Sequence, residues 1–205
     1  RNYGHMQGAK TVEDMCEVSR DLGIKYFTVY AFSTENWKRP QSEVDALMKL
    51  LRKYMVDCLE RTAKNNMRVR VIGDKTGLSE DIQKSIADVE EASAGNTGLN
   101  FTIAINYGSR GEMIRAMKKM MAGGHTDPDE LTEELFEHYL DTAGMPDPDL
   151  VIRTSGEQRV SNFLLWQLAY SEFYCTPVLW PDYNKETMIE AIRAYSKRDR
   201  RFGGV

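Results

Sequence analysis

Short apolar segments of β-branched and aromatic residues alternate with longer segments of helical period along most of the chain. The strand-like segments cover residues 25–31, 67–72, 100–105, 149–152 and 173–176. The helix-like segments are one ended by Gly23, then 42–64, 79–94, 111–121, 132–140 and 185–197. Strands separated by helices favour a mostly parallel sheet with helices on both faces. The sequence therefore predicts an α/β fold, a single domain over residues 1–205 with a central parallel sheet.

Two of these segments carry more detailed expectations. Ser42 and Asp45 stand at capping-box spacing after Pro40 and predict the start of the long helix. In the strand that follows Leu99, the side chains of Phe101, Ile103 and Ile105 are expected on one face.

Charge and cysteine content limit the possible functions. The formal net charge of −4 argues against broad binding of nucleic acids, which favours a basic surface. The three cysteines form no CxxC pair, so neither a disulfide framework nor a zinc site is expected, and a reducing, cytoplasmic location fits. No apolar run approaches the roughly 20 residues that span a bilayer. The chain begins at Arg1 rather than Met, so a preceding segment, including a targeting segment, is compatible with it.

In parallel sheets, ligands bind where loops leave the carboxyl ends of the strands. The loop 32–40 follows the first predicted strand and contains hydrogen-bonding side chains beside Arg39, whose planar fork matches phosphate oxygens. Trp37 in this loop suits either the mouth of an apolar pocket or an ordinary core anchor. The whole loop is interpreted as a phosphate-binding segment.

Two further loops have similar composition. The loop 153–162 follows an apolar strand and has two arginines, Arg153 and Arg159, with Gly156 between them and Ser161 beside them. An arginine at the end of a buried strand needs an anion, either a bound diphosphate or a nearby carboxylate. The loop 106–112 places two glycines at a predicted helix start, which suits either an anion or a plain structural turn.

Single residues give weaker indications. His5 is expected before the first helix. There it can donate a hydrogen bond to phosphate, shuttle a proton, or be simply a helix-entry residue. Glu172 is a candidate Mg²⁺ ligand or an ordinary solvated carboxylate. No phosphate loop GxxxxGK[ST], GxGxxG, HExxH or GxSxG motif is present, nor a DDxxD motif.

The three loops and the chain end resemble the cis-prenyltransferase family, most closely the bacterial undecaprenyl diphosphate synthases. The matching segments are residues 30–40 (YAFSTENWKRP), 106–108 (NYG), 152–159 (IRTSGEQR), 161–167 (SNFLLWQ), 180–182 (WPD) and 200–204 (RRFGG). They occur in the family's order from one end of the chain to the other. The resemblance implies a Mg²⁺-dependent enzyme that joins isopentenyl diphosphate to farnesyl diphosphate and makes a long polyprenyl diphosphate, a cell-wall precursor lipid.

The resemblance also implies roles for single residues. The allylic diphosphate would be bound by Arg1 and Arg39, and the isopentenyl diphosphate by Arg153, Arg159 and Ser161. The remaining predicted site residues are His5, Ser33 and Asn36 near the reacting groups, Phe32 and Trp37 beside the allylic chain, and Glu172 on Mg²⁺.

Two larger features follow from the same resemblance. The tail Arg201-Phe202-Gly203 would reach the partner's site in a homodimer. The apolar product needs a tunnel, and its expected walls are Val44, Leu47, Met48 and Leu51, with Leu99, Phe101 and Ile103 beneath. A long lipid product suggests transient contact with a membrane surface.

One family motif is absent from the sequence. It is an N-terminal strand that ends in Met-Asp-Gly-Asn-Gly-Arg-Trp-Ala, whose Asp is the main Mg²⁺ and catalytic residue. Because the later site residues are all intact, the expected reason is a sequence that starts downstream of this motif. If the motif is truly missing, little or no activity is expected, and the alternative is a non-catalytic partner subunit of such an enzyme. A nucleotide-binding α/β domain is a weaker third interpretation, because no nucleotide motif is present.

Overall fold

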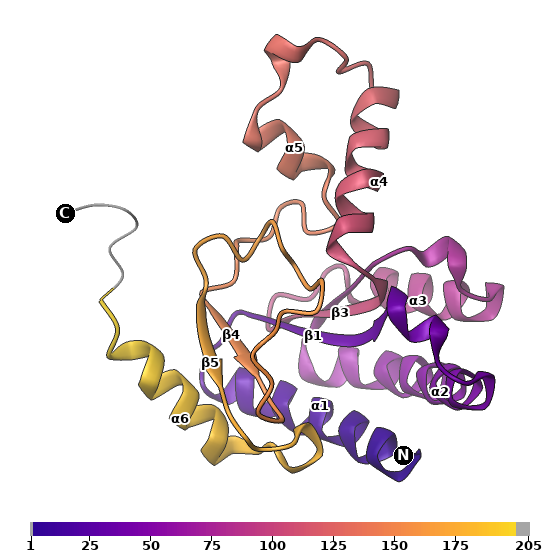
Figure 1. Cartoon of the computed structure of the whole chain (residues 1–205). Helices are drawn as coiled ribbons and strands as arrows, with labels where there is room; N and C mark the ends of the chain where they lie inside the picture. Colours follow the sequence, from indigo (N-terminus) through magenta and orange to yellow (C-terminus); the bar gives the residue numbers. More distant parts are fainter. Residues whose placement is uncertain (1, 200–205) are drawn as a thin grey trace.

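The computed structural model describes residues 2–199, with side chains from residue 4 onward (Figure 1). The helices of this part are α1 (Asn2–Asp21), α2 (Gln41–Asn65), α3 (Glu80–Ser93), α4 (Ser109–Ala122), α5 (Glu133–Tyr139) and α6 (Lys185–Ser196). The strands are β1 (Tyr26–Ser33), β2 (Arg68–Ile72), β3 (Asn100–Tyr107), β4 (Leu150–Arg153) and β5 (Glu172–Cys175). None of these helices is long and apolar enough to cross a membrane.

All strand pairs of the described chain are parallel, which confirms the predicted α/β class. The strands form two sheets, however, rather than the single expected one. One sheet has three strands in the order β1-β3-β2, and the other pairs β4 with β5. Helices α4 and α5 project away from both sheets (Figure 1).

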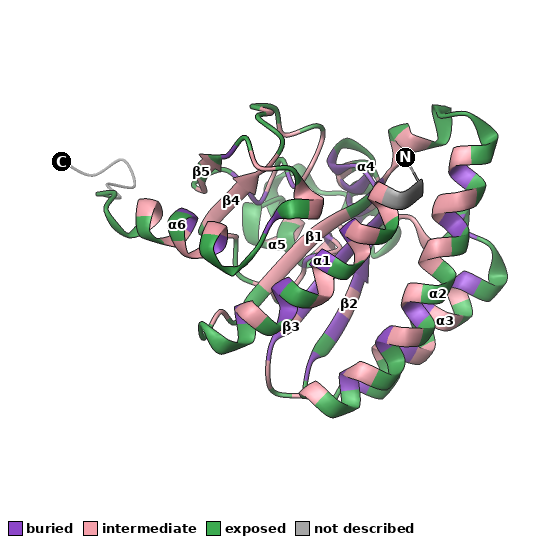
Figure 2. Cartoon of the chain, turned by 90° about the horizontal axis from the view of Figure 1, so that it is seen from below, coloured by how far each residue is buried: buried purple, intermediate pink, exposed green. Residues whose placement is uncertain are grey.

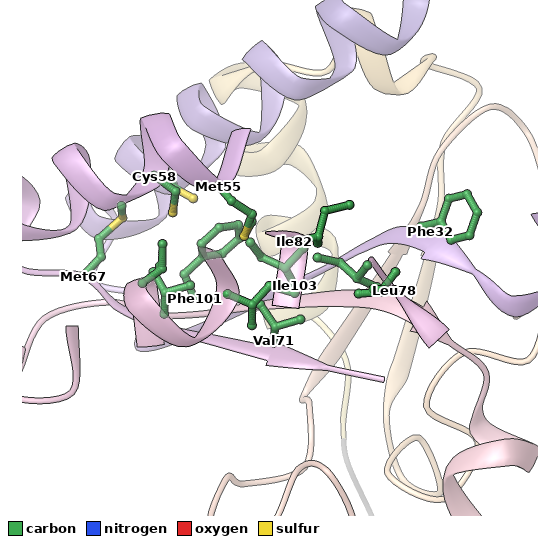
Figure 3. Close-up of a cluster of buried hydrophobic side chains, with 14 of the residues drawn as sticks. Phe32, Met55, Cys58, Met67, Val71, Leu78, Ile82, Phe101 and Ile103 are labelled. Atoms are coloured by element: carbon green, nitrogen blue, oxygen red, sulfur yellow. The ribbon is translucent and has the colours of Figure 1, made fainter. Parts of the chain in front are cut away.

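The main core lies between the three-stranded sheet and helices α2 and α3. The predicted face of β3 is confirmed, since Phe101, Ile103 and Ile105 all belong to this cluster (Figure 3). Helix α2 contributes residues such as Met55 and Cys58 at helical spacing, and α3 contributes Ile82 and its neighbours one turn apart. Burial of these aliphatic stripes fixes the helices on one face of the sheet.

Strand β1 is much less buried than its neighbour β3. Seven of the eight β3 residues are buried, whereas only Phe32 is buried in β1 (Figure 2). The cause is position, because β1 is an edge strand and pairs with β3 alone in the described chain. The unpaired edge of β1 forms one wall of a large cavity.

Several element boundaries differ from those expected from the sequence. His5 lies inside α1 rather than before it, because the helix already begins at Asn2. Phe32 and Ser33 end strand β1 rather than opening a loop. The capping box predicted at Ser42 is wrong, because α2 begins one residue earlier and Pro40 occupies the N-cap position without a side-chain cap.

Candidate functional site

A cavity of about 1790 Å³ separates the two sheets. Strand β1 lines it with residues 26–32, and β4 lines it with Leu150 to Arg153. Helices α1 and α2 complete the wall, and neither β1 nor β4 has a second strand partner in the described chain. The cavity therefore opens between the free backbone edges of two strands.

The apolar part of this cavity matches only some of the predicted tunnel. Leu47, Met48, Leu51 and Ile103 line the cavity as expected. The prediction is wrong for Val44, Leu99 and Phe101, which are buried in the core and are not part of the cavity wall. Tyr54 follows Leu51 by one turn and extends the wall along α2.

A charged cluster lies near the N-terminal ends of α1 and α2, beside the loop 34–40. Arg39 Nη1 lies 2.7 Å from Glu43 Oε1, and His5 Nε2 lies 3.7 Å from the same oxygen. His5 Nε2 is buried and has no hydrogen-bond partner in the described chain. All three side chains line the cavity, so this end offers two groups that can bind an anion and one carboxylate.

Glu43 was not found by the sequence reasoning. The only signal was its opposite charge four residues after Arg39, although Arg39 itself lies in extended backbone before α2 begins. Arg1, the other predicted ligand of the allylic diphosphate, lies outside the described residues, as do Arg201, Phe202 and Gly203.

Arg153 ends strand β4 and faces the cavity with an unsatisfied donor. Its Nε atom is buried and has no hydrogen-bond partner among the described residues. Buried polar groups are almost always paired, so this donor is available to an anion in the cavity. The alternative of an ion pair with a nearby carboxylate has no support here, since no ion pair of Arg153 is present in the described chain.

The rest of the loop 153–162 surrounds Arg153 with unusual backbone. Ser155, Gly156 and Ser161 all have positive φ, at 66°, 69° and 51°. Arg159 lines the cavity, but its guanidinium pairs with Glu157 two residues away. Ser161 is exposed and does not line the cavity.

The predicted residues of the first loop are held by neighbouring groups. The Ser33 backbone N–H donates to Asn36 Oδ1 at 2.9 Å, so the Asn36 side chain closes its own turn. Trp37 Nε1 donates to Asn106 Oδ1 at 2.7 Å, and the Trp37 ring packs edge-on against Phe32 at 5.0 Å. Of these residues, Phe32 lines the cavity, whereas Ser33, Asn36 and Trp37 do not.

Asn162 joins all three predicted loops. Its side-chain Nδ2 donates to Glu35 Oε1 at 3.1 Å, and its Oδ1 accepts from the Arg110 backbone N–H at 3.0 Å. Its carbonyl oxygen accepts from the Ser109 N–H at 2.8 Å. The three loops therefore meet at Asn162, a residue that was not singled out from the sequence.

Glu172 is placed apart from the arginines of the second loop. It pairs with Leu150 at the start of the β4–β5 ladder, and Arg153 stands at the other end. Three residues of strand correspond to roughly 10 Å. The Glu172 carboxylate pairs with Arg198, and no group of three metal-ligating side chains exists in the described chain. One carboxylate fits Mg²⁺ only together with substrate oxygens and after release of Arg198.

A buried carboxylate lies beneath the third loop. Glu112 is 1% exposed and accepts hydrogen bonds from Tyr107 Oη and the Asp141 backbone N–H. Burial raises the pKa of Glu112 above its usual value, although these donors oppose the shift. The group does not line the cavity, so it supports the loop rather than contacting a ligand there.

Comparisons with known proteins agree with this architecture. A family model described as "Putative undecaprenyl diphosphate synthase" matches residues 1–203. An isoprenyl transferase of Fusobacterium nucleatum is 50% identical over 205 residues, which cover 100% of this chain and 87% of that protein. An isoprenyl transferase of Rhizobium meliloti is 48% identical over 208 residues and is covered to 84%.

Two solved structures are also similar. Lavandulyl diphosphate synthase from Lavandula x intermedia, in complex with dimethylallyl diphosphate, has a TM-score of 0.94 and 37% identity, with 98% of this chain and 89% of that chain covered. A probable undecaprenyl diphosphate synthase from Campylobacter jejuni has a TM-score of 0.87 and 38% identity, with coverage of 97% and 92%.

Proposed function

Because this chain belongs to the undecaprenyl diphosphate synthase family and is an isoprenyl transferase, we propose that it adds isopentenyl diphosphate in cis to farnesyl diphosphate. The proposed product is a long polyprenyl diphosphate such as undecaprenyl diphosphate. The observation that carries the proposal is the buried, unpartnered Nε of Arg153 at the edge of a large and mostly apolar cavity. That combination suits a ligand with an anionic head and a hydrocarbon tail.

The reaction needs two diphosphates held side by side. The bond from the allylic carbon to its diphosphate oxygen breaks, and a carbon–carbon bond forms to isopentenyl diphosphate. A bound phosphate oxygen then takes the proton that leaves the new chain. Negative charge develops on the departing diphosphate, where arginine donors stabilise it best. His5 near the start of α1 and Arg39 just before α2 serve this group, and Arg153 with Arg159 hold the second diphosphate.

Release of Arg39 from Glu43 is part of this proposal. The Arg39 side chain is 41% exposed in this ion pair and can turn to a phosphate group, while the largely buried Glu43 carboxylate keeps His5 as a neighbour. Arg159 stands in the same relation to Glu157 and is more exposed. Both pairs keep the arginines near the cavity before substrate binds. Ser33, Asn36 and Trp37 are proposed to keep this loop in shape, since the Ser33 backbone N–H donates to the Asn36 side chain and the Trp37 side chain donates to Asn106.

Mg²⁺ bound to the diphosphates would neutralise part of their charge. Glu172 remains the proposed protein ligand, and its family role requires the carboxylate to exchange Arg198 for the ion. Farnesyl diphosphate, homodimer formation through the chain end, a cytoplasmic location and transient membrane contact are likewise parts of the proposal. They rest on the family resemblance.

We also propose that the family's first strand, which this sequence lacks, occupies the gap between β1 and β4. The unpaired edges of both strands border the cavity and expose backbone groups that a strand would satisfy. Such a strand would join the two sheets into the single sheet predicted from the sequence. Its Asp- and Gly-rich end would then reach the loops at the carboxyl ends of the strands.

Assay of the two substrates tests the proposal. The protein is incubated with farnesyl diphosphate, labelled isopentenyl diphosphate and Mg²⁺, and the extracted lipids are separated by length. A ladder of polyprenyl products supports the function. Complete inactivity of the protein carrying the family's first strand would favour a non-catalytic partner subunit instead.

A further inference from the structure

Asn162 occupies a backbone conformation that few residues adopt. Its φ is 62°, and Ser161 before it has a φ of 51°. Asparagine is one of the few side chains common in this left-handed region. The backbone there directs the Asn162 amide across to two other loops, so one side chain spans three segments distant in sequence.

Each polar atom of the Asn162 side chain has a defined partner. Nδ2 donates to Glu35 Oε1 in the loop that carries Arg39, and Oδ1 accepts from the backbone N–H of Arg110 at the start of α4. Thr34 Oγ1 donates to the second oxygen of Glu35 at 3.1 Å. The amide can bridge both sides only in this orientation, because it has one donor end and one acceptor end.

The surroundings leave little room for another arrangement. A Cβ atom on Gly108 would lie 2.7 Å from Asn162 Nδ2 and 2.7 Å from Thr34 Oγ1. Glycine at this position therefore permits the close approach. Ser109 is fully buried, and its Oγ accepts from the Leu165 N–H at 2.9 Å, which fixes the chain after Asn162 as well.

The charge state of Glu35 matches its role as acceptor. Burial opposes ionisation, but hydrogen bonds from its own backbone N–H and from Asn162 and Thr34 outweigh it and lower the pKa of the Glu35 carboxyl. Glu35 is thus a carboxylate at neutral pH. A hydrogen bond to a charged group is stronger than one between neutral groups.

From this geometry we infer that Asn162 is a positioning residue that sets the distance between the two diphosphate sites. Asn162 acts without contacting either diphosphate. One of its bonds holds the loop of Arg39, and its own segment carries Arg159 and Ser161. Because the inference concerns the spacing of these two sites, it rests on the proposed function. Reacting carbons must approach to about 3–3.5 Å, so a small shift between the loops slows the condensation strongly.

The test exchanges the amide donor and the carboxylate acceptor between positions 162 and 35 in the complete protein. Asn162→Asp keeps the size and the acceptor for Arg110 but sets a carboxylate against Glu35. We expect kcat to fall roughly 10- to 100-fold, with the KM values for both substrates changed much less. In Asn162→Asp with Glu35→Gln, the glutamine donates to the aspartate and the whole network returns. We expect this double variant to recover most of the lost kcat.

A matched control separates positioning from general destabilisation. Asn96 Nδ2 donates to the carbonyl oxygens of Thr62 and Met67 at 3.0 and 2.7 Å, and none of these three residues lines the cavity. Asn96→Asp also removes an amide donor, so it should lower the melting temperature and leave kcat unchanged. A wild-type kcat in Asn162→Asp would overturn the inference. A double variant no better than Asn162→Asp would overturn it equally.

Hydrogen exchange of the ligand-free protein gives a readout that does not depend on activity. Segments 33–39 and 153–162 should exchange faster in Asn162→Asp than in wild type and return to wild-type rates in the double variant. If the wild-type protein makes no product, the proposed function fails, and these exchange rates still decide whether Asn162 holds the loops together. Equal exchange in all variants would show that it does not.

Discussion

Arg153 is the residue on which the second diphosphate site most depends. Changing it to Ala should raise the Kd of isopentenyl diphosphate by about 30-fold, or about 2 kcal/mol, because a charge-assisted, forked contact is lost. Arg153→Lys keeps the charge without the planar fork of donors. Its Kd for isopentenyl diphosphate should lie between those of wild type and Arg153→Ala. Titration of isopentenyl diphosphate into each variant measures the effect. An unchanged Kd in Arg153→Ala would remove Arg153 from the site.

The buried carboxyl group of Glu112 should make the stability of the protein depend on pH. Its pKa is raised in the folded state, mainly by burial. Its contribution is therefore fully present below the pKa of the unfolded chain and is lost as pH rises through the folded-state pKa. Glu112→Gln removes this titration. The unfolding free energy of each protein is measured with denaturant between about pH 4 and 8. The value of the variant minus that of wild type should increase as pH rises. Parallel curves would contradict the raised pKa.

At the level of single elements, helix α2 lines the cavity along only part of its length. Leu51 lines the cavity, whereas Leu59, two turns later, is 38% exposed. Leu51→Trp should narrow the hydrocarbon part of the cavity and shift the products to shorter chains. Leu59→Trp places the same side chain on the same helix outside the cavity and should leave the product lengths unchanged. Lipid chromatography compares them, and an identical ladder from both variants would contradict a product tunnel along α2.

The elements were largely predictable from the sequence, because each depends on local pattern. Alternation gave the strands, and helical period gave α2 and α3 within a few residues. The start of α2 was missed because Pro40 and Ser42 both signal a helix start and only the backbone decides between them. Asn162 and Glu43 were missed because their roles come from partners brought close by folding, and no periodicity reports that. The cavity edge at β1 also required the sheet order, which periodicity does not contain.

At the scale of the whole molecule, the two sheets leave a gap that divides the proposed site. Arg39 stands with α2 and the three-stranded sheet, and Arg153 stands with the β4–β5 pair. Asn162 bridges these two parts through Glu35. Alignment of the substrates therefore depends on how the two sheets are held together as well as on the arginines themselves.

The proposed homodimer makes a prediction of its own. A chain that ends after Asp199 lacks the tail proposed to enter the partner's site, and Arg153→Ala lacks the arginine of that site. Each variant alone should have little activity. Mixing them after reversible dissociation should restore turnover, because one site of the mixed dimer then has both an intact Arg153 and an intact tail. No recovery, with mixed dimers demonstrated, would contradict a shared site.

The most direct measurement compares this 205-residue chain with a version that carries the family's first strand and its Asp- and Gly-rich end. Both receive farnesyl diphosphate, labelled isopentenyl diphosphate and Mg²⁺, and the lipids are separated by length. We expect a ladder that ends in a long polyprenyl diphosphate from the extended version, and far less product from the shorter chain. Absence of product from both would contradict the proposed condensation and favour a non-catalytic partner subunit.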